Sequence, residues 1–186
     1  MKKITLKSVT LIIVSTFSIS SCASQPIYRT STTPLDTVSH VDLNKYLGTW
    51  YEIYRLPNKF ENIDCKNITA NYSLREDGNI KVINSCTKTN NKLDQSTGIA
   101  KVVDSVTNAK LKVSFFRPFY GDYWIIDLAP DYSWVMVGEP EGKYFWILSR
   151  TPTLSANTES ILLAKAKELG YPTQDFIKPK HVALPQ

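Results

Sequence analysis

The chain has 186 residues and a formal net charge of +5; 42% of its residues are hydrophobic and 11% are aromatic. This length and composition favour one domain with a substantial core and exclude disorder over most of the chain. Lys2, Lys3 and Lys7 lie in the first 21 residues, and without them 19 basic residues face 17 acidic ones, a net charge of +2. That excess is too small to indicate a nucleic-acid-binding protein. The two histidines, His40 and His181, lie near the ends, which argues against histidine metal sites and Ser-His-Asp catalysis, and we expect no metal or other cofactor.

Residues 1–21 have the pattern of a signal peptide. A positively charged start precedes an apolar run over residues 9–14, which is too short to span a membrane. The segment ends in Ile19-Ser20-Ser21-Cys22, which resembles the bacterial lipoprotein cleavage box. The resemblance implies cleavage before Cys22 and acylation of that cysteine. An ordinary signal peptide with a coincidental cysteine is the alternative.

The residues after the signal segment predict a lipid anchor and a tether. An acylated Cys22 carries several acyl chains, and two suffice for stable membrane anchoring. Ala23 follows it, whereas an Asp there is typical of lipoproteins retained in the inner membrane, so we expect the outer membrane, with the domain facing the periplasm. Residues 22–40 are rich in Ser, Thr and Pro and show no apolar periodicity, which predicts a flexible, extended tether. The folded domain is expected over residues 41–186.

From Thr49 to Ser149 the chain alternates short β-rich runs with turn signals. Eight such runs without an intervening helix predict an all-β, up-and-down antiparallel sheet, and closing it into a barrel removes its edges. An eight-stranded barrel has room for side chains or for one small ligand. The predicted strands span residues 49–54, 67–74, 80–87, 98–103, 110–116, 123–128, 133–138 and 144–149.

One α-helix is predicted after the strands. Ser155 is its expected N-cap, residues 156–169 are good helix formers, and Gly170 ends it. We expect it to pack on the barrel wall through one apolar face. The expected face contains Ile161, Leu162, Ala164 and Leu169.

Three sequence motifs resemble those of the lipocalin family. Gly48-Thr49-Trp50 matches the G-x-W opening, and Asp131-Tyr132 stands where the second signature has T-D-Y, with Pro130 in place of the Thr. The run from Trp146 to Pro152 resembles the third signature, with Arg150 as its basic residue. Their order on an eight-strand pattern makes the resemblance specific, and it extends over roughly residues 41–180. It is strongest to the bacterial outer-membrane lipoprotein type and the apolipoprotein D type. The resemblance implies a barrel that binds a small apolar molecule.

A meander places alternate connections at opposite ends of the barrel. Trp50 begins the first strand, Asp131-Tyr132 lies in the sixth connection, and Arg150 ends the eighth strand, so all three meet at one end. A guanidinium over the indole face is a suitable plug. We therefore assign Trp50 and Arg150 to barrel closure, with direct ligand contact as the alternative.

The interior is predicted from strand alternation and from the resemblance. Taking Trp50 as inward makes Glu52 and Tyr54 inward as well. The resemblance to the apolipoprotein D type places pocket residues at Tyr46, Tyr72, Asn84 and Trp146. The predicted ligand-binding set is Tyr46, Glu52, Tyr54, Ala70, Tyr72, Asn84, Val113, Phe115 and Trp146.

This lining is mostly apolar and suits an acyl chain. A filled barrel without a ligand is the alternative. The inward carboxylate of Glu52 needs a partner, and the sequence leaves Arg150, water and a ligand head group open.

The loops at the opposite end form the predicted mouth. They span residues 57–66, 87–96, 117–122 and 139–143. An apolar rim and a positive charge there suit a lipid with an anionic head group, and an ordinary solvated loop set is the alternative. The rim residues are Phe60, Phe119 and Tyr120, and the basic residues are Lys59, Lys66, Lys88, Lys92, Arg117 and Lys143.

The other two cysteines, Cys65 and Cys86, both belong to the mouth. An exported protein permits a disulfide between them. A two-residue turn at Asp77-Gly78 does not place them directly opposite, so the bond requires the first loop to fold back or a bulge to shift the register. A free reactive pair is the alternative.

Three classes of function remain open at this point. The first is a non-catalytic carrier or scavenger of fatty acids or lysophospholipids, anchored in the outer membrane. The second is a structural or interaction lipoprotein with a filled barrel. The third is an enzyme, whose site would have to consist of Glu52 and tyrosines because no internal histidine exists. We assign no catalytic residue.

Overall fold

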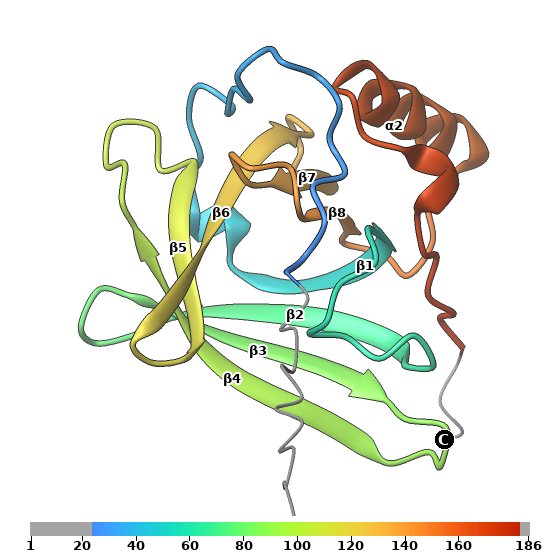
Figure 1. Cartoon of the computed structure of the whole chain (residues 1–186). Helices are drawn as coiled ribbons and strands as arrows, with labels where there is room; N and C mark the ends of the chain where they lie inside the picture. The colour runs from blue at the N-terminus through green and yellow to red at the C-terminus, as the bar shows by residue number, and fades with distance from the viewer. Residues whose placement is uncertain (1–23, 183–186) are drawn as a thin grey trace, which may run out of the picture.

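The computed structural model describes residues 24–182 and shows a closed barrel of eight antiparallel strands, each paired with its neighbours in chain order (Figure 1). The signal segment and Cys22 lie outside the described residues. The strands are β1 (Gly48–Arg55), β2 (Lys66–Leu74), β3 (Ile80–Thr87), β4 (Leu93–Val102), β5 (Lys110–Phe116), β6 (Phe119–Leu128), β7 (Trp134–Gly138) and β8 (Phe145–Ser149). The helical elements are α1 (Leu43–Tyr46), α2 (Ala156–Glu168) and the 3₁₀ turn η1 (Thr173–Asp175). The predicted fold is confirmed.

Two strands are longer at the mouth than predicted. β4 begins at Leu93 rather than at residue 98, and β6 begins at Phe119 rather than at residue 123. The residues at the start of β4 are exposed and mostly polar, so they show no apolar alternation. They are strand because β3 supplies a partner, with Cys86 opposite Asp94.

Helix α2 begins where predicted, but only part of its predicted face is buried: Leu162 and Leu169 pack on the barrel, whereas Ala164 is exposed. The Thr158 N–H donates to Ser155 Oγ at 3.1 Å, which caps the helix. Leu162 and Ala166, four residues apart, are the buried pair, whereas the predicted Ile161 is 48% exposed. The helix lies along one side of the barrel (Figure 1).

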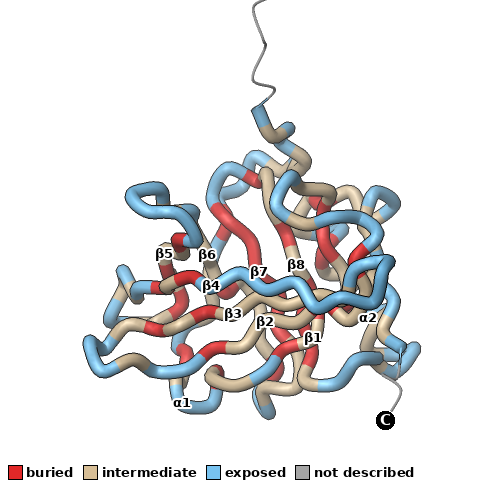
Figure 2. The backbone as a smooth tube through the Cα atoms, turned by 90° about the horizontal axis from the view of Figure 1, so that it is seen from below, coloured by how far each residue is buried: buried red, intermediate tan, exposed pale blue. Residues whose placement is uncertain are grey.

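The fold has two apolar cores that the sheet separates. One fills the barrel interior around Trp50 and Tyr72, at the end away from the mouth. The other lies outside, where Leu162 of α2 packs with Ile53 and Met136. Figure 2 shows buried residues along the strands and exposed ones in most loops.

Arg150 and Trp50 meet at the end of the barrel opposite the mouth. The Arg150 guanidinium carbon lies 3.8 Å from the centroid of the Trp50 ring. Arg150 also donates hydrogen bonds to backbone carbonyls between the first helix and β1, including that of Leu47 at 2.9 Å. The Trp50 Nε1 donates to the Tyr46 carbonyl at 2.9 Å. These contacts hold α1 across the barrel end, which is therefore closed.

The segment before the barrel packs against it. The Tyr28 N–H donates to the Gly142 carbonyl at 2.9 Å, and the Thr30 N–H donates to the Gly170 carbonyl at 2.9 Å. Leu35 is buried. Gly142 has a φ of +71°, and a Cβ there would overlap Arg29, so this close approach requires glycine. The described part of residues 22–40 thus differs from the extended tether that the sequence predicts.

Candidate ligand-binding site

The ladder register identifies the side chains that face the barrel interior. Trp50 is opposite Ala70, and Ala70 is opposite Asn84. Because directly opposed residues share a face, Ala70 and Asn84 point inward with Trp50. Val113 shares that face, because it pairs with the buried Ala100 of β4.

Hydrogen-bonded tyrosines fill the interior next to the closed end of the barrel. The Tyr46 and Tyr123 hydroxyl oxygens lie 2.6 Å apart, and those of Tyr72 and Tyr123 lie 3.0 Å apart. Burial raises the pKa of all three well above the usual tyrosine range. The hydroxyls therefore stay neutral and form a polar floor on top of the closed end.

The interior above this floor retains accessible surface. Ala70, Asn84, Val113 and Trp146 are only partly buried although they face inward, whereas Trp50 is fully buried. Asn84 Oδ1 has no hydrogen-bond partner among the described residues. Ala70, Val113 and Trp146 nevertheless contact the edge of the buried core. This part of the interior therefore presents apolar wall and one amide oxygen that is unpartnered within residues 24–182.

Phe115 stands at the opening of this space. A Cβ placed on Gly98 would lie 2.9 Å from the Phe115 ring, so the ring crosses β4 where it has no side chain. The Phe115 residue is 44% exposed. It belongs to the entrance rather than to the deep interior.

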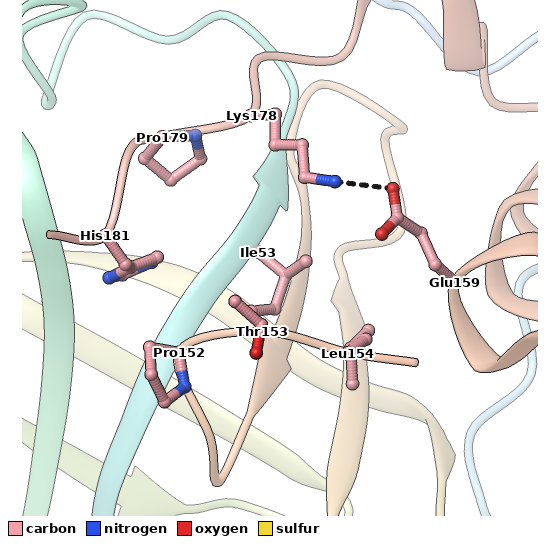
Figure 3. Close-up of a pocket in the computed structure, with 8 residues that line it drawn as sticks. All are labelled: Ile53, Pro152, Thr153, Leu154, Glu159, Lys178, Pro179 and His181. Atoms are coloured by element: carbon pink, nitrogen blue, oxygen red, sulfur yellow. Dashed lines mark hydrogen bonds and ion pairs between the residues drawn. The ribbon is translucent and has the colours of Figure 1, made fainter. Parts of the chain in front are cut away.

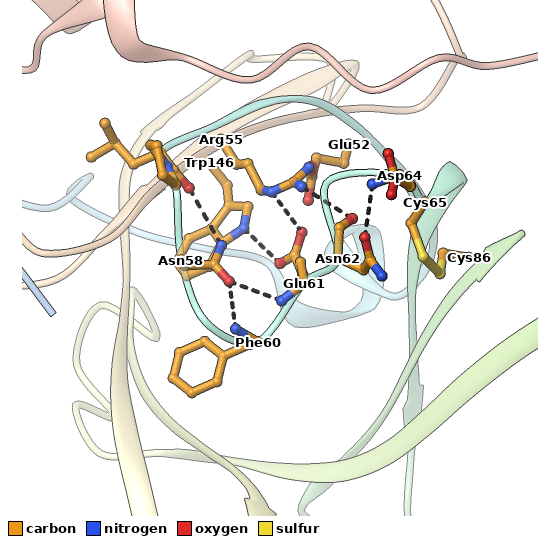
Figure 4. A network of polar contacts seen from close by, with 12 residues as sticks. Glu52, Arg55, Asn58, Phe60, Glu61, Asn62, Asp64, Cys65, Cys86 and Trp146 are labelled. Carbon is orange, nitrogen blue, oxygen red and sulfur yellow. Dashed lines mark hydrogen bonds and ion pairs between the residues drawn. A yellow bond between two sulfur atoms is a disulfide. The ribbon is translucent and has the colours of Figure 1, made fainter. Parts of the chain in front are cut away.

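A polar cluster occupies the wall between the interior and the β1–β2 loop (Figure 4). Arg55 Nη1 lies 2.6 Å from Glu52 Oε1, and Arg55 Nε lies 3.3 Å from Glu61 Oε2. The Trp146 Nε1 donates to Glu61 Oε1 at 3.1 Å. Glu52 and Arg55 are buried. Burial, and then the neighbouring Glu61 charge, raise the pKa of Glu52 well above the ordinary glutamate range.

This cluster contains the partner of Glu52, which the sequence had left open. The carboxylate pairs with Arg55, and Arg150 lies at the opposite, closed end. Sequence reasoning missed Arg55 and Glu61, because neither belongs to the alternation that starts at Trp50. The signal that pointed to them was the inward carboxylate itself, which requires a cation nearby.

The predicted inward position of Tyr54 is wrong. The pairing of β1 with β8 shifts between Glu52 and Tyr54, so the alternation reverses at this bulge. Tyr54 lies outside the barrel, where its hydroxyl donates to Glu159 of α2 and its ring packs near Phe176. Arg55 takes the inward position opposite Trp146.

The predicted disulfide between Cys65 and Cys86 is confirmed, with a Cα–Cα distance of 5.6 Å. The register of β2 and β3 shifts between Lys66 and Thr69, and Asn67 has a φ of +52° there. This irregularity brings Cys65 next to Cys86. The bond fixes the end of the β1–β2 loop that carries Glu61 (Figure 4).

A second hollow lies outside the barrel, between β1, α2 and the C-terminal segment (Figure 3). Its volume is about 140 Å³, and Ile53, Leu154 and His181 contribute to its lining. The Lys178–Glu159 ion pair of 2.6 Å crosses one side of it. Pockets for ligands of drug size span roughly 300–1,000 Å³, so this hollow is too small for a lipid.

Within residues 24–182, no group of three or more His, Cys, Asp or Glu side chains is arranged to hold a metal ion. The helices of that same span include none that is long and apolar enough to cross a membrane.

Comparison with known proteins supports the barrel fold and identifies relatives that are similar in sequence. The family model described as a lipocalin-like domain matches residues 41–181. The chain is 44% identical over 141 residues to the outer membrane lipoprotein Blc of Escherichia coli K12, covering 75% of this chain and 79% of that protein. It is 38% identical over 155 residues to apolipoprotein D of Rattus norvegicus, covering 78% and 75%. Insecticyanin of the tobacco hornworm Manduca sexta has a similar structure, with a TM-score of 0.62 at 22% identity and coverage of 78% and 84%.

Proposed function

Because the chain belongs to the lipocalin family, we propose that it is an outer-membrane-anchored protein that carries, stores or scavenges fatty acids or lysophospholipids in its barrel. As a lipocalin it is a binding protein and not an enzyme. The chemistry of the interior and of the mouth favours these two classes of lipid.

The observation that carries the proposal is the division of the barrel interior into a closed floor and an upper half whose inward side chains are only partly buried. Tyr46, Tyr72 and Tyr123 close the floor through their hydroxyl contacts. Ala70 and Val113 leave apolar surface accessible above it. A single acyl chain entering from the mouth buries apolar area on such a wall, which is favourable at about 25 cal/mol per Å².

The head group would remain near the entrance. Asn84 offers a buried amide oxygen without a partner among the described residues, and it can accept a hydrogen bond from a head-group donor. Exposed basic residues at the mouth, such as Lys92 and Arg117, favour an anionic head group, with an attraction that salt weakens.

The membrane location rests on the sequence and on the relatives. The Ile-Ser-Ser-Cys sequence predicts acylation of Cys22, and the relatives at 44% and 39% identity are named outer membrane lipoproteins. Replacing Cys22→Ser should abolish acyl labelling and release the protein from the membrane fraction. Unchanged labelling of this variant would contradict the anchor.

Native mass spectrometry after gentle extraction tests the carrier function directly. We expect a co-purified species with the mass of a fatty acid or a lysophospholipid. An empty barrel that also fails to bind added lipid would favour the alternative of a structural lipoprotein.

A bulky substitution locates the lipid. Ala70→Trp should fill the interior beside Tyr72 without removing a polar contact, and a titration with a fluorescent fatty acid should show much weaker binding. Ser73→Trp is the matched control, because Ser73 is exposed on the outer face of the same strand. Equal affinities of the parent and a folded Ala70→Trp variant would place the lipid outside the barrel.

A further inference from the structure

Besides Phe115, six large apolar side chains are exposed at the mouth end of the barrel. Between 65% and 77% of the surface of each residue is exposed. They come from the N-terminal segment, from the β1–β2 loop and from the strand ends beside the β3–β4 and β5–β6 turns, so they surround the entrance. The rim, as the term is used below, is Ile27, Phe60, Ile63, Leu93, Phe116 and Phe119.

The most prominent part of the rim is the β5–β6 turn. The Phe116 and Phe119 rings stack with centroids 6.5 Å apart and planes 6° from parallel. Both residues are more than 70% exposed, so the stack faces solvent. Exposed aromatic residues grouped in this way mark an interaction surface.

The charge around the rim points to an anionic partner surface. Lys88 pairs with Asp94 and Lys143 pairs with Glu141. Lys59, Lys92 and Arg117 are exposed and form no ion pair among residues 24–182. Of the exposed acids on these connections, only Asp64 has no ion-pair partner within that span.

The chain enters the described structure at this same end. The Gln25 side chain donates to the Pro57 carbonyl of the β1–β2 loop at 2.6 Å, and the next contacts, from Tyr28 and Arg29, reach Gly142 of the β7–β8 loop. Cys22 precedes Gln25 by three residues, which span roughly 10 Å at full extension. An acyl anchor at Cys22 therefore keeps the mouth, rather than the closed end, next to the bilayer.

From this geometry we propose that the rim docks on the surface of a phospholipid bilayer that carries anionic head groups. The aromatic stack enters the interfacial region while Lys59, Lys92 and Arg117 meet lipid phosphates, as in other amphipathic membrane-surface elements. The barrel entrance then opens onto the membrane, so a ligand passes between the bilayer and the interior without crossing water. This proposal rests on the proposed function in one respect, the acylation of Cys22.

Lipid quenching tests the docking in the acylated full chain. A fluorophore is attached at Phe119→Cys on the rim or, as the matched control, at Val106→Cys on the closed end, where Val106 is 83% exposed. Each protein is reconstituted into vesicles of phosphatidylethanolamine and phosphatidylglycerol that contain a phospholipid with a nitroxide near the top of its acyl chain. We expect strong quenching at position 119 and none at position 106, and a loss of the quenching at 119 when Lys92→Glu and Arg117→Glu are added.

Each other outcome has a distinct meaning. A chain that floats with the vesicles but is unquenched at 119 overturns the docking, as does equal quenching at both positions. If the label at position 119 is shielded from solvent in a way that depends on protein concentration and not on lipid, the rim binds a second copy of the chain. That result would also overturn the docking. A chain that does not float contradicts both the anchor and the docking. Ala70→Trp separates the two proposals further, because it should lose fatty-acid binding while the label at position 119 remains quenched.

Discussion

Arg55 Nη1 donates a buried hydrogen bond of 2.6 Å to Glu52 Oε1 although the two residues lie three positions apart on one strand. Residues at that spacing point to opposite faces of a regular strand. The register shift between Glu52 and Tyr54 reverses the alternation and turns both side chains toward each other. Glu61 then joins the same guanidinium from the β1–β2 loop. One bulge thus creates the polar cluster at the entrance of the barrel.

Glu52 should make the stability of the protein fall with rising pH. Burial and the Glu61 charge raise its pKa, so the folded chain keeps a proton that the unfolded chain releases from about pH 4.3 upward. The stabilising contribution is fully present below that pH and is lost as the pH rises through the folded-state pKa. Glu52→Gln should flatten this decline, measured by urea unfolding at a series of pH values.

The matched control for this measurement is Glu76→Gln, because Glu76 is exposed in the β2–β3 turn. Its free energy of unfolding should follow that of the parent at every pH. A parent whose stability changes with pH in parallel with Glu52→Gln would show that Glu52 ionises as freely in the folded chain as in the unfolded one.

The sequence predicts the strand order because each strand is local in sequence and each is bounded by turn residues. The contact between Trp50 and Arg150 was also predictable, because a meander places alternate connections at opposite ends of the barrel. The interior of β2 was also predictable, because the strand is regular from Thr69 to Leu74 and Tyr72 stays in phase with Ala70.

The bulges were not predictable, since they arise from pairing across the barrel rather than from local sequence. The shift at Ile53 moved Tyr54 outside and Arg55 inside. The buried face of α2 also depends on its partner, because the wall accepts Leu162 and Ala166 rather than Ile161. The N-terminal segment is ordered by hydrogen bonds to loops far away in sequence, such as the one at Gly142.

The outward position of Tyr54 gives a prediction that separates stability from binding. Tyr54→Phe removes the hydroxyl that donates to Glu159 and should lower the free energy of unfolding by about 1 kcal/mol. The affinity for a fluorescent fatty acid should not change, because the ring lies outside the barrel against Phe176. A loss of affinity with unchanged stability would place Tyr54 back in the interior.

Trp50 and Arg150 should contribute to stability rather than to ligand contact. Trp50→Ala removes a fully buried ring and should cost about 3–5 kcal/mol. Arg150→Met leaves the carbonyls around Leu47 without their donor and should cost about 1–3 kcal/mol. Urea unfolding measures both. An Arg150→Met variant that keeps the parent's unfolding midpoint but loses lipid binding would contradict this assignment.

The Cys65–Cys86 disulfide should stabilise the mouth more than the closed end. Its two cysteines are 21 residues apart, and a loop of this size gives about 3 kcal/mol in the chain-entropy model. Cys65→Ser with Cys86→Ser should therefore unfold at a lower urea concentration, and the parent in a reducing agent should match it. The bond also holds the loop that carries Glu61, so hydrogen exchange should rise more at residues 58–64 than around Trp50, where only the loss of global stability acts. Uniform acceleration over the whole barrel would show that the bond acts on global stability alone, and unchanged exchange at both ends would show that the ion pairs of Arg55 suffice to hold the loop.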